Sequence, residues 1–193
     1  MKGFHLAACL LALSAPIPAM GADTDWGLPS LMASLSQVKS ASARFVEHKS
    51  VQMLTRPLEA TGTLTYVAPR TMEKKTLSPA PESIELRGDM LSGLRSNGDR
   101  YSVDLNEHPE VAALVEGIRS TLAGDLPTLE RYYIVRLLGT RGAWQLLLTP
   151  RDESVRDKVD VIRIVGAGTA LAEVDIHEID GDHSEMIVTP DAS

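Results

Sequence analysis

The chain has 193 residues, a formal charge of −7 at pH 7 and a hydrophobic fraction of 44%. This length suits one domain around a single core, and the acidic charge disfavours nucleic acid and anionic membrane surfaces as partners. Aromatic residues make up only 4% of the chain, too few for platforms on which bases or sugars stack.

The first 22 residues predict a cleavable signal peptide. Lys2 supplies the positive charge, and Leu6 to Leu13 form an apolar run that is too short to span a bilayer. Pro16 and Pro18 follow, and the small residues ending at Ala22 form the expected cleavage region. We therefore expect export, most naturally to a bacterial periplasm.

Cleavage at Ala22 leaves residues 23–193 as one domain, with 171 of the 193 residues and a formal charge of −8 once Lys2 is lost. It also removes Cys9, the single cysteine, which lies too early in the apolar run for a lipoprotein cleavage site. A chain without cysteine has no disulfide, no catalytic thiol and no thiolate metal ligand.

The mature chain opens with a helix, for which Pro29 can occupy the first turn. An apolar stripe at helical spacing follows, and Ser40 to Ala43 are expected to end the helix. The first strands are predicted at Phe45–Gln52, Leu58–Val67, Thr71–Leu77, Glu82–Arg87 and Met90–Leu94, with another containing Tyr101, Val103 and Leu105.

Helices interrupt this run of strands. Pro109 can open a helix that ends before Gly124, and Asp125 can cap a second, shorter one. Later strands are predicted at Tyr132–Leu138, Ala143–Thr149, Val159–Val165, Leu171–Ile179 and Ser184–Thr189. Eleven strands joined by short turns predict one antiparallel sheet, strongly curved or nearly closed.

Polar residues crowd the last predicted turn: His177, Glu178, Asp180, Asp182, His183 and Glu185. They could form a metal site or the solvated flanks of an Asp-Gly turn. Their spacing fits neither an EF-hand nor a zinc motif, so turn chemistry is favoured and no metal is expected. Lys74 and Lys75 are interpreted as an exposed strand edge.

No nucleophile elbow, P-loop or dinucleotide fingerprint is found in the sequence. We therefore expect no catalytic residue and no cofactor. A convergent catalytic triad can be scattered along a chain, so a periplasmic hydrolase stays open as an alternative.

Several short motifs, in order, resemble the periplasmic outer-membrane lipoprotein carrier family LolA, in a divergent branch. They are Leu31, Leu35 and Val38 of the first helix, Ala43-Arg44-Phe45, Gly62-x-Leu64 with Pro69, Pro79 with Ile84 and Gly88, Tyr133-x-Val135, Gly142, and Leu148-Thr149-Pro150. The resemblance covers residues 28–189.

The resemblance implies an incomplete antiparallel β-barrel of eleven strands, covered by helices that act as a lid. It also implies a carrier that holds the acyl chains of a lipoprotein or lipid without catalysis. An inner-membrane exporter would be the donor and an outer-membrane component the acceptor, and we expect a monomer. A lipoprotein-sensing regulatory module on the same fold is the alternative.

Acyl chains need shelter because about 0.8 kcal/mol is lost for each methylene left in water, or roughly 13 kcal/mol for a ~16-carbon chain. The predicted cavity residues are Phe45, Leu64, Tyr66, Met72, Ile84, Leu86 and Met90. The predicted lid face consists of Val111, Leu114, Val115, Ile118 and Leu122. The alternative for each residue is an ordinary filled core.

One position departs from the family pattern. The family's segment reads Arg-Pro, and that arginine fastens the lid by hydrogen bonds, whereas this chain has Ala68 before Pro69. Alanine cannot donate a hydrogen bond from its side chain, and Arg70 is displaced by two residues. Another group is therefore expected to hold the lid.

Overall fold

The structure is a computed structural model that describes residues 26–191, so the predicted signal peptide lies outside the described residues. The helices are α1 (Leu28–Leu35), α2 (Pro109–Ala123), α3 (Leu126–Tyr132) and α4 (Glu153–Arg156). The strands are β1 (Ser40–Ser50), β2 (Leu58–Val67), β3 (Thr71–Ser78), β4 (Glu82–Arg87), β5 (Met90–Leu94), β6 (Arg100–Asp104), β7 (Tyr133–Thr140), β8 (Ala143–Pro150), β9 (Val159–Ala167), β10 (Ala170–Glu178) and β11 (His183–Pro190).

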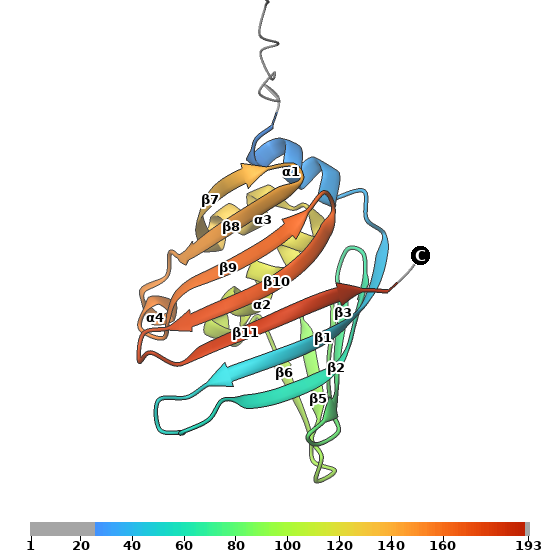
Figure 1. Cartoon of the computed structure of the whole chain (residues 1–193), viewed down its shortest axis with the longest axis vertical. Helices are drawn as coiled ribbons and strands as arrows, with labels where there is room; N and C mark the ends of the chain where they lie inside the picture. The colour runs from blue at the N-terminus through green and yellow to red at the C-terminus, as the bar shows by residue number, and fades with distance from the viewer. Residues whose placement is uncertain (1–25, 192–193) are drawn as a thin grey trace, which may run out of the picture.

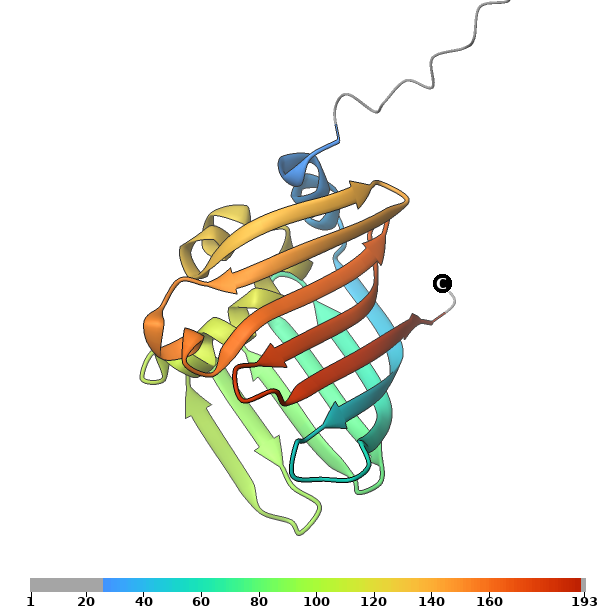
Figure 2. The same ribbon diagram turned by 60° about the vertical axis from the view of Figure 1, so that its left-hand side comes forward.

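The eleven strands form one antiparallel sheet in the order β6-β5-β4-β3-β2-β1-β11-β10-β9-β8-β7. The first and last strands of this order do not pair, so the sheet is strongly curved but not closed. Figures 1 and 2 show α2 and α3 on its concave side, with α1 at one end. The expected fold class is confirmed.

The main core lies between the helices and strands β7 to β10. Leu31 of α1 and Leu129 of α3 are fully buried there against Leu146 of β8 and Ile164 of β9. Apolar residues two apart on a strand point to the same face, and the inner residues of β8 and β9 are almost completely buried, whereas Val135 of β7 and Ile176 of β10 are partly buried. In the described chain, no helix has the length and apolar composition needed to cross a membrane.

Local signals predicted most elements well. Pro109 occupies the first turn of α2, Gly124 adopts the left-handed conformation at φ 66°, and the Asp125 side chain accepts from the Thr128 amide. The prediction for Ser40 to Ala43 was wrong, because these residues already pair with β2 as the start of β1. The short helix α4 was not predicted.

Candidate functional site

The concave face of β1 to β6 carries two rows of cross-strand neighbours, defined by register. One row runs Tyr66, Met72, Leu86, Leu91 and Val103 across β2 to β6. The next runs Leu64, Lys74, Ile84, Gly93 and Tyr101. Residues directly opposite one another share a face, so these rows form one wall, here called the cup wall.

The cup wall is less completely covered than the inner faces of β8 and β9. Leu64, Met72 and Ile84 are half-buried, whereas Leu146 and Ile164 on the other half are 0% exposed. Leu86, Leu105 and Ala112 form a small separate core, with Met72, Leu91, Val111 and Val115 packed against it. Apolar side chains therefore remain partly accessible on the concave side of β2 to β6.

The structure places the predicted cavity residues in three environments. Phe45, Tyr66 and Leu86 are buried, at 2 to 4% exposure. Leu64, Met72 and Ile84 are half-buried on the cup wall. The prediction that Met90 lines the cavity needs correction, because Met90 pairs with Arg87 on the convex face and is 43% exposed. Leu91, opposite Leu86, takes the inward position.

The predicted lid helix α2 buries a different set of residues most deeply. Val111, Leu114, Val115, Ile118 and Leu122 are all half-buried. Leu114 and Ile118 pack against the main core, and Val111 and Val115 against the small one. The fully buried positions are small or polar: Ala112, Ala113, Glu116, Gly117, Arg119, Ser120 and Thr121.

Small residues let the helix approach the sheet closely. A side chain at Gly117 would meet the Tyr133 hydroxyl at 3.1 Å, and that hydroxyl donates to the Ala113 carbonyl at 2.7 Å. Burial, and then the charge of Glu116, raises the pKa of Tyr133 well above its usual range. Tyr133 therefore remains a neutral donor that ties β7 to α2.

Arg119 of α2 makes the second attachment to the sheet. Its side chain is only 6% exposed, and its guanidinium forms a bidentate ion pair with Glu116, with Nε to Oε2 at 3.1 Å. It also donates to the Gly88 carbonyl in the β4–β5 turn and lies 3.5 Å from Asp89 Oδ1. Ser120 donates to Glu116 at 2.9 Å and completes the network.

This network joins α2 to the β4–β5 turn through side-chain hydrogen bonds, which the side chain of Ala68 cannot make. The donor lies on the helix and the acceptor on the β4–β5 turn, and Arg70 binds Asp89 in the same turn. A guanidinium has five N–H donors in a fixed fork, so it can pair with a carboxylate and a carbonyl together. Sequence reasoning missed Arg119, although Glu116 and Arg119 at i,i+3 signal such a pair.

Lys74 is not at a strand edge, because β3 lies between β2 and β4; the sequence interpretation was wrong. Its ammonium ion pairs with Glu47, which also accepts from Ser184 Oγ at 3.0 Å. The same ammonium lies 4.9 Å from the centroid of the Phe45 ring. The concave face thus combines apolar residues with the ion pair between Lys74 and Glu47.

Tyr66 adds an unpaired polar atom to the same wall. Its hydroxyl is buried and makes no hydrogen bond within the described chain. Burial raises the pKa of Tyr66, so the hydroxyl keeps its proton. An unpaired buried hydroxyl costs about 1–3 kcal/mol, which a ligand with a hydrogen-bond acceptor would recover.

Two hollows are lined mainly by residues outside the cup wall. One, of about 440 Å³, is lined mainly by polar residues of β3 to β6, including Glu73, Glu85 and Ser102, and it also contacts Gly93 and Tyr101 of the second row. The other, of about 200 Å³, lies beside Pro109, Arg131 and Tyr132. Neither has the aliphatic lining that an acyl chain needs.

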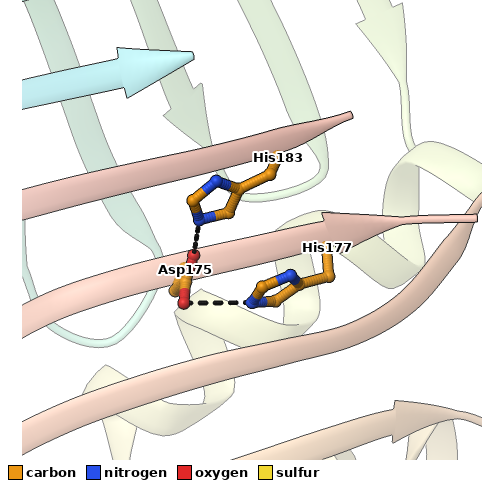
Figure 3. Close-up of side chains that lie close together, drawn as sticks. All are labelled: Asp175, His177 and His183. Atoms are coloured by element: carbon orange, nitrogen blue, oxygen red, sulfur yellow. Dashed lines mark hydrogen bonds and ion pairs between the residues drawn. The ribbon is translucent and has the colours of Figure 1, made fainter. Parts of the chain in front are cut away.

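A cluster of one aspartate and two histidines lies on the convex face of β10 and β11. His177 and His183 are directly opposed across the two strands, and their rings stack with centroids 4.8 Å apart. Asp175 reaches both histidines, as Figure 3 shows, with Oδ2 3.1 Å from His177 Nε2 and Oδ1 2.7 Å from His183 Nε2. The side chain of Asp175 is only 4% exposed.

Sequence reasoning named both histidines but missed Asp175. The missing signal was register: His177 and His183 are equally far from Asp180, so a tight turn there makes them cross-strand partners. Asp175 precedes His177 by two residues and therefore shares its face.

A family model matches most of this chain. The family model described as "Outer membrane lipoprotein carrier protein LolA-like" matches residues 17–193. No curated protein matches the chain.

Solved structures with a similar fold have low sequence identity. The LolA superfamily protein NE2245 from Nitrosomonas europaea has 10% identity and a TM-score of 0.42, with 83% of this chain and 90% of that chain covered. A DUF1329 family protein from Desulfovibrio piger has 8% identity and a TM-score of 0.45, with 84% of this chain and 88% of that chain covered. MucB, solved in complex with MucA, has 15% identity and a TM-score of 0.43, with 86% of this chain but only 55% of the MucB chain covered.

Proteins of the LolA-like family are periplasmic and generally non-catalytic, and they bind lipids or lipoproteins. The family model spans most of this sequence. The chain therefore belongs to the LolA-like family of outer membrane lipoprotein carrier proteins.

Proposed function

We propose that this protein is a periplasmic carrier that shelters acyl chains of a lipoprotein or lipid against the cup wall and ferries them toward the outer membrane. The observation that carries the proposal is the contrast between the cup wall and the inner faces of β8 and β9. Leu146 and Ile164 are fully buried, whereas Leu64 and Ile84 at inward positions are only half-buried.

An acyl chain covering the partly exposed side chains would remove apolar surface from water on both partners, at about 25 cal/mol per Å². Val115 and Ile118 of α2 are half-buried as well, so the helix supplies the opposite side of the same binding surface. The Tyr66 hydroxyl offers a hydrogen bond to an ester or amide carbonyl near the chain. No catalytic step is part of the proposal.

The test uses the mature chain, a synthetic triacylated lipopeptide and a fluorescent fatty acid as probes. Leu64→Glu and Ile118→Glu should abolish binding of both probes, because a carboxylate would be buried against the acyl chain. Val67→Glu is the matched control, since Val67 is on the same strand as Leu64 but 52% exposed on the convex face.

Circular dichroism must show that all three variants are folded. Unchanged binding by folded Leu64→Glu and Ile118→Glu would refute the cup wall as the binding surface. In a separate experiment, mass spectrometry of lipids that co-purify with the protein from the periplasm would identify the cargo. Recovery of hydrolysed lipid fragments after incubation with intact lipid would refute a non-catalytic carrier.

A further inference from the structure

We infer that Asp175, His177 and His183 form a binding site for one divalent transition-metal ion, with Zn²⁺ the best match. The three side chains each offer one ligand atom, and these atoms lie within 4.8 Å of one another. The site is on the convex face, so it is independent of the proposed acyl cargo.

The distances are close to those of a metal centre. Ligands about 2.0–2.2 Å from one ion lie about 3–4 Å apart, so closing the set requires movements of less than about 1 Å. Asp175 Oδ1 is buried and makes no hydrogen bond, although His183 Nε2 is only 2.7 Å away.

The surroundings hold the three ligands in place. Arg163 donates to Asp175 Oδ2 from Nε at 3.0 Å and from Nη2 at 2.7 Å, which fixes the carboxylate and leaves Oδ1 available. The turn between the histidines is closed by the Glu178 amide, which donates to the Asp182 carbonyl at 2.9 Å. The backbone amide of Gln52 in the β1–β2 loop donates to Asp182 Oδ1 at 3.0 Å. Outer partners of this kind orient metal ligands.

The ligand chemistry selects the class of ion. Two imidazoles and one carboxylate suit Zn²⁺ and its neighbours, whereas Ca²⁺ and Mg²⁺ prefer oxygen ligands alone. Three protein ligands leave one tetrahedral position for water or for a side chain of a partner protein. A bound ion would also join β10 to β11 through His177 and His183.

The test is a Zn²⁺ titration of the untagged mature chain against a chromogenic chelator at about pH 7.5. We expect one site with a Kd on the order of 1 µM. His177→Ala, His183→Ala and Asp175→Asn should each weaken binding at least about tenfold. His48→Ala and His108→Ala are the matched controls, because neither histidine belongs to the three-residue cluster; they lie 3.4 Å from Glu59 and 3.6 Å from Glu110.

Co²⁺ provides a second readout, because visible absorption from cobalt on the mature chain should disappear in His177→Ala and His183→Ala. The histidines are 45% and 33% exposed, so these variants should fold, and circular dichroism checks this. Absence of Zn²⁺ binding would overturn the inference. Binding that survives both histidine substitutions, or Ca²⁺ binding in preference to Zn²⁺, would overturn it as well.

Discussion

Removing the charge of Arg119 should strongly destabilise the protein. The side chains of Arg119 and Glu116 are only 6% and 10% exposed, so Arg119→Met would leave the Glu116 carboxylate buried without its cation. Breaking a buried ion pair from one side costs about 3–5 kcal/mol. Methionine keeps much of the volume of the arginine stem, so most of the loss should be electrostatic.

The double variant Glu116→Gln/Arg119→Met separates this effect from a loss of packing. With no charge left buried, it should be more stable than Arg119→Met by at least about 2 kcal/mol. Arg70→Met is the matched control, because Arg70 binds Asp89 in the same turn but is 49% exposed. Its cost should stay below about 1 kcal/mol.

Urea denaturation followed by circular dichroism and by the fluorescence of buried Trp144 gives the free energy of unfolding. The midpoint should fall for Arg119→Met with little change in the slope. A loss below about 1 kcal/mol for Arg119→Met would refute the reasoning. A double variant as unstable as the sum of its single variants would refute it too.

Two further predictions concern buried tyrosines. Tyr66→Phe should leave the free energy of unfolding unchanged or raise it by about 1 kcal/mol, because the buried hydroxyl has no hydrogen-bond partner. The same variant should weaken binding of an acyl ester more than binding of a hydrocarbon dye. Equal weakening of both would contradict a hydrogen bond from Tyr66 to the cargo. Tyr133 keeps its proton in the folded state, since burial and the charge of Glu116 raise its pKa, whereas an unfolded tyrosine releases its proton near pH ~10. Stability from this group is therefore complete below about pH 10 and falls as the pH rises further, so alkaline urea titrations should show a smaller fall for Tyr133→Phe; identical slopes for the two proteins would refute this.

Patterns local in sequence determined the elements of this protein. Alternation in Leu58–Val67 identified a strand and its two faces, because successive side chains on a strand point in opposite directions. Pro109 and Gly124 marked both ends of α2, because proline suits a first turn and glycine tolerates a left-handed cap. Runs of strands joined by short turns predicted a strongly curved sheet, and the family resemblance added an incomplete barrel covered by helices.

Some of the missed detail was present in the sequence but required register. A tight turn at Gly88-Asp89 pairs Arg87 with Met90, so Leu91 rather than Met90 shares the face of Leu86. At the last hairpin, a two-residue turn at Asp180-Gly181 would pair His177 with Ser184, whereas the observed register is centred on Asp180 and pairs His177 with His183. Register converts a local pattern into neighbours across strands, and a one-residue shift moves every side chain to the opposite face.

Only the tertiary structure decided which distant groups meet. Glu47 and Lys74 are on strands separated by β2, and sheet curvature brings their charges together on the inner wall. Arg119 reaches Gly88 because α2 crosses back over the concave face. The sequence alone determined most of the strands and turns and both ends of α2, since these depend on residues a few positions apart. The fastening of the helix and the charges inside the wall depend on strand order and curvature, which no local pattern contains.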